Sequence, residues 1–355
     1  FENSYSVTPI DAELDFDLSK AIDGRDWTDA DKFSFTVTAP EGTPLPDPAT
    51  VTVSKKDAED GIAAIKFGKI HYTAAGTYKY EIRENAGSAA GMTYDAHVAT
   101  AEVTVTDNGK GKLSVSRNPD GDVAFTFTND YNVTSIKTSV TDQITATKVL
   151  TGRELGLKAG EFSFELVEGD VVVAKGTNTA DGKIAMDKIT YDKPGKHTYT
   201  LREAKGNVGG ITYDGTTYTI ETIVKDNGDG TLDVEHKLQD ADEAKFTNSY
   251  KPGSKVSSVT DQITATKVLT GRDLGLKAGE FRFELVEDNN VVVTGTNNAD
   301  GKIVMDPVTY TEAGEHTYTL RETKAGAIEN GITYSTAEYA IVTKVTDNGD
   351  GTLGV

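Results

Sequence analysis

The sequence predicts an all-β protein built of three tandem immunoglobulin-like β-sandwich domains. Thirty-five glycines and fifteen tyrosines, together with abundant Thr and Val, indicate many short strands joined by tight turns. A segment that starts at Ser139 recurs almost unchanged from Ser258, a period of 119 residues, and a more diverged copy precedes both. A chain of 355 residues also has the length of about three ordinary domains.

Composition excludes several classes of partner. Lys plus Arg number 36 against 56 Asp plus Glu, a formal charge of −20 that repels nucleic acid phosphates and anionic lipid head groups. Apolar runs stay well below the roughly 20 residues needed to span a bilayer, so we expect no membrane insertion in this fragment. The sequence has no cysteine, which excludes disulfides and thiol-ligated metals. We expect no metal and no cofactor.

The internal repeats set the predicted domain boundaries. The first five residues, "FENSY", nearly match "FTNSY" at 246–250, so they are predicted to be the closing strand of a preceding repeat. The polar segments "NVTSIKTSVT" and "KPGSKVSSVT" are typical of short connections between domains. The three predicted β-sandwiches are residues 6–132, 133–251 and 252–355, and we refer to them as repeats one, two and three.

Repeat three is expected to lack its final strand. Adding the 119-residue period to Asn248 places the corresponding asparagine twelve residues beyond Val355. We therefore expect an exposed sheet edge in repeat three and a chain cut from a longer array. An unpaired edge invites an added strand, and a neighbouring molecule could supply "FENSY".

The stretch "DNGDG" occurs in both of the closely matching repeats. Asn-Gly and Asp-Gly favour positive φ and predict a β-hairpin turn. The stretch also resembles part of a calcium loop, but the bidentate Glu at its twelfth position is absent. A simple hairpin is the favoured interpretation, and a cation site is the alternative.

Strand parity places charged residues on apolar faces, because every second side chain of a strand points the same way. In repeat two Lys148 shares a face with Ile144, Ala146 and Leu150. Two further polar residues fall on such faces. Glu203 follows Tyr199 and Leu201, and Asn248 lies between Phe246 and Tyr250. The corresponding polar residues are Lys20, Glu84 and Asn129 in repeat one, and Lys267 and Glu322 in repeat three.

Two interpretations of these polar residues remain open on parity alone. Lys and Glu are rarely buried unless paired, so they could form a buried ion pair with Asn as a hydrogen-bond partner. Alternatively, desolvation favours a neutral lysine amine and a protonated glutamic acid. The amine could then attack the Asn side-chain carbonyl, with the acid polarising that carbonyl and passing protons to the departing ammonia. The product would be an amide cross-link between side chains.

The motifs "ATKVLTGR", "HTYTLRE", "GITYD", "DNGDGTL" and "KFTNSY", in this order, resemble the streptococcal pilin isopeptide-linkage domain. That family occurs in the backbone pilins and stalk repeats of Gram-positive surface proteins. The resemblance covers repeats two and three, and repeat one more loosely through "LSKAIDGR", "YEIRE" and "FTNDY". It implies self-formed isopeptide bonds that join the first strand of a domain to the last.

The resemblance also implies a role for each matching residue. The cross-linked pairs would be Lys20 with Asn129 and Lys148 with Asn248, and the catalytic acids would be Glu84, Glu203 and Glu322. The bond of repeat three is in doubt, because only Lys267 and Glu322 match. If a neighbouring molecule supplies "FENSY", Asn3 would face Lys267 of the next chain. Such chemistry is single turnover, so the protein is not expected to be an enzyme.

The expected function is a structural shaft or stalk segment of a pilus or adhesin, extracellular and at the cell surface. Its expected partners are neighbouring repeats or subunits of the same polymer. The alternative is an adhesin domain that contacts a host glycan or protein receptor. Repeat one is the candidate for that alternative, because it carries Trp27, the single tryptophan, and a Pro-rich insertion at 40–48. The competing interpretation of Trp27 is ordinary packing beneath a loop.

Overall fold

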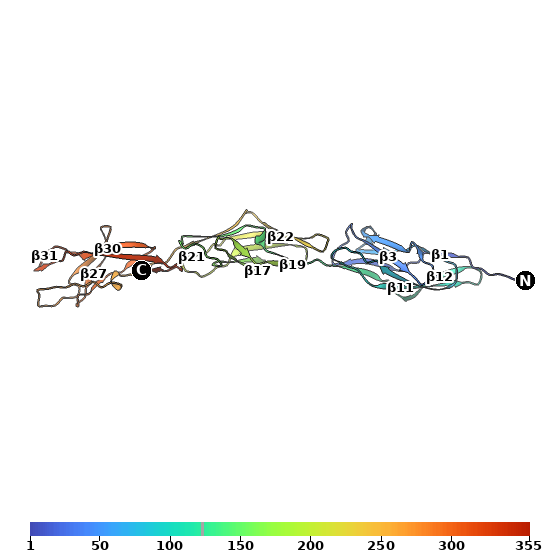
Figure 1. Ribbon diagram of the computed structural model, residues 1–355, viewed down its shortest axis with the longest axis horizontal. Coiled ribbons are helices and arrows are strands. Elements are labelled where there is room, and N and C mark those ends of the chain that lie inside the picture. The colour runs from blue at the N-terminus through green and yellow to red at the C-terminus, as the bar shows by residue number, and fades with distance from the viewer. Residues whose placement is uncertain (122–123) are drawn as a thin grey trace. The chain divides into compact units, whose positions relative to one another are not determined.

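The structure is a computed structural model that describes residues 1–121 and 124–355. Strands dominate it, as the sequence predicts (Figure 1). The helical segments among the described residues are three short 3-10 turns: η1 (Lys55–Asp57), η2 (Val140–Asp142) and η3 (Val259–Asp261). None of the helices in this part of the chain has the length and apolar character needed to cross a membrane.

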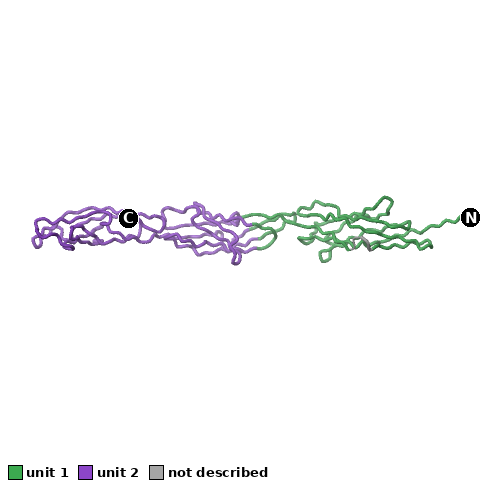
Figure 2. The backbone as a smooth tube through the Cα atoms, turned by 90° about the horizontal axis from the view of Figure 1, so that it is seen from below, with its two compact units in different colours: residues 1–138, 190–196, 223–235 green, residues 139–189, 197–222, 236–355 purple. Residues whose placement is uncertain are grey.

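Contacts between residues divide the chain into two compact units (Figure 2). Unit 1 comprises Phe1–Thr138, Thr190–Lys196 and Ile223–Glu235, and unit 2 comprises Ser139–Ile189, His197–Thr222 and His236–Val355. Repeat one therefore lies in unit 1 and repeat three in unit 2. Residues of repeat two belong to both units, so the two units do not coincide with the three predicted repeats.

Repeat one is a sandwich of two five-stranded sheets and a three-stranded sheet. The sheet orders are β10-β13-β2-β7-β6, β12-β11-β9-β3-β5 and β1-β8-β4. Its strands are β1 (Ile10–Ala12), β2 (Leu18–Asp23), β3 (Lys32–Thr38), β4 (Pro46–Asp47), β5 (Thr50–Ser54), β6 (Ala58–Glu59), β7 (Ile62–Ile65), β8 (Lys69–Tyr72), β9 (Gly76–Glu84), β10 (Met92–Thr93), β11 (Val98–Asp107), β12 (Leu113–Gly121) and β13 (Thr126–Tyr131).

The core of repeat one lies between its sheets because alternate side chains of each strand are apolar. Leu18 of β2 and Phe127 of β13 come from one sheet, and Phe35 of β3 and Ile82 of β9 come from the other. All four belong to a single buried cluster. The first and last long strands of the repeat, β2 and β13, run parallel and side by side.

Repeat two has the same plan with fewer strands in one layer. The sheet orders are β15-β24-β21 and β18-β17-β16-β20-β22-β23. Here too the first and last strands, β15 and β24, pair in parallel. The strands are β14 (Ile136–Thr138), β15 (Ala146–Thr151), β16 (Ser163–Glu168), β17 (Val171–Asn178), β18 (Ile184–Met186), β19 (Ile189–Tyr191), β20 (Gly195–Glu203), β21 (Ile211–Thr212), β22 (Thr217–Asp226), β23 (Leu232–Leu238) and β24 (Ala244–Tyr250).

Repeat three keeps the large sheet, in the order β28-β27-β26-β30-β33-β34. Within the described chain no strand corresponds to β24, and residues 265–270, the counterpart of β15, form only an isolated bridge between Thr266 and Lys302. The strands are β25 (Lys255–Ser257), β26 (Arg282–Glu287), β27 (Asn290–Asn297), β28 (Ile303–Met305), β29 (Val308–Tyr310), β30 (Gly314–Glu322), β31 (Ile328–Glu329), β32 (Ile332–Thr333), β33 (Tyr339–Asp347) and β34 (Leu353–Gly354).

The connection before repeat three is more structured than the sequence predicts. Residues Lys255–Ser257 form β25, which pairs with β29. Ser258 then caps η3, and its hydroxyl also donates to the carbonyl oxygen of Met305 at 2.8 Å. Because a serine side chain can satisfy a free backbone N–H at the start of a helical turn, this polar segment packs onto the domain instead of forming a free linker.

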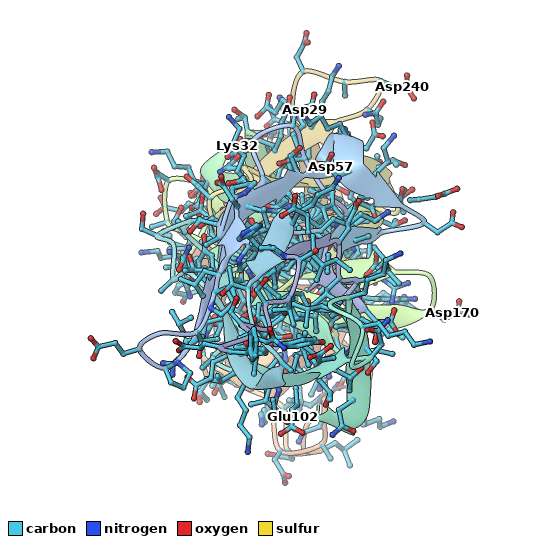
Figure 3. The ribbon with its side chains drawn as sticks, turned by 90° about the vertical axis from the view of Figure 1, so that its right-hand side faces the viewer. Asp29, Lys32, Asp57, Glu102, Asp170 and Asp240 are labelled. Atoms are coloured by element: carbon cyan, nitrogen blue, oxygen red, sulfur yellow. The ribbon has the colours of Figure 1, made fainter. Side chains whose placement is uncertain are left out.

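The acidic excess is carried on the outside of the sheets. Asp170 and Asp240 are exposed and point outward from loops in unit 2 (Figure 3). Charged side chains avoid burial unless they are paired, so the acidic and basic residues that are buried are the ones that require explanation.

Candidate functional site

Repeat one buries a lysine, a glutamate and an asparagine in contact with one another. Lys20 lies on β2, Glu84 on β9 and Asn129 on β13. The Nζ atom of Lys20 is 3.0 Å from Oε2 of Glu84, and Nδ2 of Asn129 donates to Oε1 of the same carboxyl at 2.7 Å. The lysine and glutamate side chains have no exposed surface. One carboxyl thus joins the amine to the amide nitrogen.

Repeat two reproduces this arrangement on β15, β20 and β24. Nζ of Lys148 is 2.8 Å from Oε2 of Glu203, and Nδ2 of Asn248 donates to Oε1 at 2.7 Å. The Lys148 and Glu203 side chains again have no exposed surface. The burial that strand parity predicts for these residues is confirmed in both repeats.

The parallel pairing of the first and last strands brings the lysine and the asparagine together. In repeat one Lys20 is the partner of Phe127, and Asn129 is two residues further along β13. In repeat two Lys148 is the partner of Phe246, and Asn248 again follows by two. Residues two apart share a face of the sheet, and diagonal neighbours on adjacent strands are within reach of long side chains.

The asparagine carbonyl is held by a backbone N–H that the sequence analysis did not identify. The N–H of Asp95 donates to Oδ1 of Asn129 at 2.8 Å, and that of Asp214 donates to Oδ1 of Asn248 at 2.7 Å. From the sequence we expect the glutamic acid to polarise this carbonyl. In the structure the glutamate contacts the two nitrogens, and the backbone donor contacts the oxygen, where negative charge would develop during attack by the amine.

The aspartate side chain fixes the position of this donor. The carboxylate of Asp214 accepts from the backbone N–H of Thr247 at 2.6 Å and from that of Thr216 at 2.8 Å. It therefore ties the loop after β21 to strand β24, beside Asn248. The motif "GITYD" contains this aspartate, but a hydrogen bond from its backbone could not be read from the residue type.

Aromatic rings lie beside the two buried amines, and burial shifts the pKa values of the site. Nζ of Lys20 lies 4.9 Å from the ring centroid of Phe33, and Nζ of Lys148 lies 4.7 Å from that of Phe162. Burial lowers the pKa of both lysines and raises the pKa of Glu84. Both directions disfavour the charged forms, as expected away from water, and they favour the neutral amine that a nucleophile requires.

Repeat three assembles only part of the site. Lys267 and Glu322 form an ion pair, and Oε2 of Glu322 accepts from the backbone N–H of Ser335 at 3.0 Å. The two side chains retain 10% and 5% of their exposed surface. A groove of about 650 Å³ opens beside them, and its lining includes Ile263 and Val342. Among the described residues Glu322 therefore has the lysine amine and a backbone N–H as partners and no asparagine.

The N-terminal segment that contains Asn3 is exposed and forms no strand over residues 1–7 of the described chain. Asn3 lies outside the three clusters just described. Its predicted partner, Lys267, would belong to another molecule, so the pairing of the two stays a prediction.

Trp27 and the Pro-rich insertion, the features that suggested receptor binding, form contacts within repeat one. Trp27 is only 8% exposed, its ring packs edge-on against Phe33, and its Nε1 donates to the carbonyl oxygen of Gly61 at 2.9 Å. In the Pro-rich insertion, Pro46–Asp47 forms β4 and pairs with β8. Trp27 thus has the packing role of a core residue, the competing interpretation given above.

The "DNGDG" stretches form hairpin turns, the favoured interpretation of the sequence. In repeat two the N–H of Asn227 donates to the carbonyl oxygen of Thr231 at 3.1 Å, and Gly228 and Gly230 both have positive φ. Glycine adopts this conformation without steric strain. The turn therefore lies where strands β22 and β23 are joined.

Comparison with known proteins gives one curated relative and several similar structures. A pilin of Streptococcus pyogenes serotype M1 is 30% identical over 117 residues, which are 31% of this chain and about a third, 32%, of the relative. The major pilin T-13 of S. pyogenes is 19% identical, with 69% of this chain and 98% of that chain covered and a TM-score of 0.27. Two B repeat units of the collagen-binding protein of Staphylococcus aureus are 16% identical, with coverages of 95% and 72% and a TM-score of 0.26.

The family comparison accounts for most of the chain. The profile of the FctA family, described as the Spy0128-like isopeptide-containing domain, matches residues 16–132, 144–251 and 263–355. Each match falls within one of the three predicted repeats, and the first two include a complete Lys-Glu-Asn cluster. The chain therefore belongs to the family of Spy0128-like isopeptide-containing domains, of which it carries three copies.

Proposed function

We propose that the chain is a shaft or stalk segment of a Gram-positive pilus or surface adhesin, strengthened by self-formed isopeptide bonds. The bonds would join Lys20 to Asn129 and Lys148 to Asn248. The observation that carries the proposal is the buried cluster in repeats one and two, in which one carboxyl contacts both the lysine amine and the asparagine amide nitrogen. What favours the reaction over a buried ion pair is the backbone N–H that donates to the asparagine oxygen, where negative charge would develop.

The cluster contains every group that the reaction needs. The neutral amine of Lys148 attacks Cγ of Asn248, a new C–N bond forms, and the bond from Cγ to Nδ2 breaks. Glu203 takes a proton from the attacking nitrogen and delivers a proton to Nδ2, so ammonia leaves and the carboxyl returns to its initial state. The backbone N–H of Asp214 stabilises the negative oxygen in between. Glu84 and Asp95 would act in the same way in repeat one.

A mechanical role follows from the strands that the bonds would connect. β15 and β24 are the entry and exit strands of repeat two, and they pair in parallel. A covalent bond between them would carry tension from one end of the repeat to the other without loading the remaining strands. A chain that contains no cysteine would thereby gain the reinforcement that disulfides give other extracellular proteins.

Placement at the cell surface is supported by the family and by the name of the curated relative, a pilin. We propose an extracellular location, with neighbouring repeats or subunits of the same polymer as partners. The proposed domain boundaries remain 6–132, 133–251 and 252–355, with residues 1–5 as the closing strand of a preceding repeat. The family matches within each range support this division.

Intact-mass spectrometry tests the proposal directly. The purified chain should weigh less than its sequence predicts by two molecules of ammonia, one for each of repeats one and two. Replacing Glu203 by Ala should restore the mass of one ammonia and leave repeat two folded, because the strands remain while the proton carrier is lost. Arg202→Ala, on the opposite face of the same strand, is the matched control and should keep both bonds. A wild-type mass equal to the sequence mass would refute the proposal.

A further inference from the structure

A tyrosine hydroxyl meets a glycine-rich hairpin at three places in the structure. In unit 1, Oη of Tyr131 donates to Oδ1 of Asp226 at 2.8 Å and accepts from the N–H of Gly230 at 3.0 Å. In unit 2, Oη of Tyr250 donates to Asp347 at 2.6 Å and accepts from the N–H of Gly351 at 3.1 Å. The hairpins are the "DNGDG" turns. Each hydroxyl uses its donor and its acceptor on one turn.

The third example uses the N-terminal segment. Oη of Tyr5 lies 2.9 Å from both carboxylate oxygens of Asp107 and accepts from the N–H of Gly111 at 2.8 Å. The turn here is "DNGKG", the counterpart in repeat one. The tyrosine in each case is the last residue of a segment with the pattern F-x-N-x-Y. The hairpin in each case belongs to the repeat that follows in the chain.

A backbone hydrogen bond accompanies each tyrosine at the same spacing. The residue three positions after the tyrosine donates its N–H to the carbonyl oxygen of the last glycine of the turn. The three pairs are Thr8 with Gly111 at 2.9 Å, Thr134 with Gly230 at 2.8 Å and Gly253 with Gly351 at 2.9 Å. Because the same hydrogen-bond geometry occurs three times, it indicates a specific contact between a closing segment and the next repeat.

Glycines allow the backbones to approach at two of these contacts. A Cβ atom added to Gly91 would lie 2.7 Å from Cα of Gly230, and one added to Gly210 would lie 3.1 Å from Cα of Gly351. An arginine of the preceding repeat also packs on the ring of the tyrosine that closes that repeat. The guanidinium of Arg25 stacks over Tyr131 at 4.6 Å, and that of Arg153 lies 5.9 Å from the ring centroid of Tyr250.

We propose that the D-N-G-x-G hairpin is a socket for the terminal tyrosine of the preceding repeat, and that this contact is the standard joint between consecutive repeats. The occupant is the F-x-N-x-Y closing segment of the neighbouring repeat. Binding of the tyrosine explains why the hairpin has an aspartate and closely spaced glycines although it lacks a calcium-binding glutamate. The joint does not depend on isopeptide bond formation.

The test is amide hydrogen exchange on the full chain carrying Tyr131→Phe or Tyr250→Phe. The informative amides are those of Thr134 and Gly253, because each donates to a carbonyl oxygen that the substitution leaves in place. We expect Tyr131→Phe to speed exchange at Thr134 by about tenfold, the size expected for losing a hydrogen bond to an ionised acceptor. Tyr250→Phe should do the same at Gly253, and strands β16 and β26 should be unchanged.

Three controls keep the result interpretable. Tyr78→Phe removes a hydroxyl that bonds only within repeat one, to the carbonyl oxygen of Ala74, and should leave both joints unchanged. The number of ammonia molecules lost, measured as the difference between the intact mass and the mass of each variant's own sequence, should be the same in all variants, which separates this proposal from the cross-linking proposal. Adding calcium or a chelator should not alter exchange at Thr134, whereas a calcium-dependent change would support the cation-site interpretation and overturn the socket.

A double-mutant cycle supplies a second measurement. Asp226→Ala combined with Tyr131→Phe should speed exchange at Thr134 by less than the product of the two single effects, because the two substitutions share the hydrogen bond between Oη and Oδ1. Independent, multiplicative effects would contradict the proposal. Unchanged exchange at Thr134 and Gly253 in the two tyrosine variants would overturn it.

Discussion

Repeats two and three have nearly the same sequence around their lysine and glutamate, yet the two sites differ. The side chains of Lys148 and Glu203 have no exposed surface, whereas those of Lys267 and Glu322 are 10% and 5% exposed. In repeat two the lysine strand β15 is paired with β24. In the described part of repeat three the corresponding segment has no such partner. The closing strand, more than the lysine strand itself, therefore creates the sealed environment of the site.

The same comparison applies to the apolar side chains near the site. In repeat three Val268, Val342 and Tyr339 are 70%, 62% and 65% exposed. Their counterparts in repeat two, Val149 and Tyr218 among them, are half-buried. Removing apolar surface from water is the main favourable contribution to strand docking. The groove of repeat three thus has the surface character of a site that a strand would cover.

The largest expected effect comes from making repeat two resemble repeat three. Asn248→Ala should abolish its cross-link, because the carbonyl that the amine attacks is removed. Opening a loop of about 100 residues in the chain-entropy account should lower the free energy of unfolding of repeat two by about 4 to 5 kcal/mol. Differential scanning calorimetry, with Ser249→Ala on the opposite strand face as control, measures the loss. Equal unfolding temperatures for the two variants would contradict it.

The reverse change is to give repeat three a closing strand. We propose that the "FENSY" segment of a second molecule can fill the groove, with Asn3 facing Lys267 and Glu322, and that an isopeptide bond then forms between chains. Concentrated protein should show a ladder of multiples on a denaturing gel, and Asn3→Ala should abolish the ladder. Glu2→Ala is the matched control. A single monomer band at every concentration would eliminate the covalent link.

A smaller effect is expected from the loop that holds the asparagine carbonyl. Repeat three has Ser335 where repeat two has Asp214, and a serine has one side-chain oxygen in place of the two with which Asp214 accepts from Thr216 and Thr247. Asp214→Ser should therefore leave repeat two folded but slow its cross-linking by about tenfold, less than the loss of a whole oxyanion donor. A time course of ammonia loss during refolding, followed by mass spectrometry, measures the rate. Lys245→Ser, on an exposed position of β24, is the control, and equal rates would exclude a role for Asp214.

The smallest effect concerns the joints and alkaline pH. Burial, followed by the hydrogen bond to an aspartate, raises the pKa of Tyr131 and of Tyr250. The folded state therefore favours the protonated phenol. Its contribution should be fully present below the ordinary tyrosine pKa of about 10 and should be lost as pH rises through the higher value of the folded state. Exchange at Thr134, corrected for intrinsic rates, should show this alkaline loss in wild type and not in Tyr131→Phe. Identical profiles would contradict the prediction.

Much of the fold could be predicted because alternation and repetition are visible in the sequence. Parity placed Lys148, Glu203 and Asn248 on buried faces, since a β-strand has a fixed two-residue period. The strand β25 was missed because its residues read as a polar connection. Its pairing with β29 depends on a register that only the tertiary structure supplies.

The parts of the site that were missed act through the backbone or through distant contacts. The N–H of Asp214 is a donor that every residue except proline possesses, so its residue type gives no signal. The approach of Phe162, which lies just before β16, to the lysine amine on β15 depends on how the two sheets of the repeat pack together. Tyr250 was assigned to a buried face, but the use of its hydroxyl by a hairpin about 100 residues later could not be inferred from parity.

The parallel pairing of the first and last strands would also determine when the proposed cross-link can form. Contacts between residues that are far apart in the chain form late, because the intervening loop must first be closed. In the proposed reaction Lys148 would therefore have no partner until β24, the last strand of its repeat, has been synthesised. A repeat that is truncated, or that is not yet fully synthesised, could not form its cross-link. The cross-link is irreversible, and it would form only after the whole repeat has been synthesised and has folded.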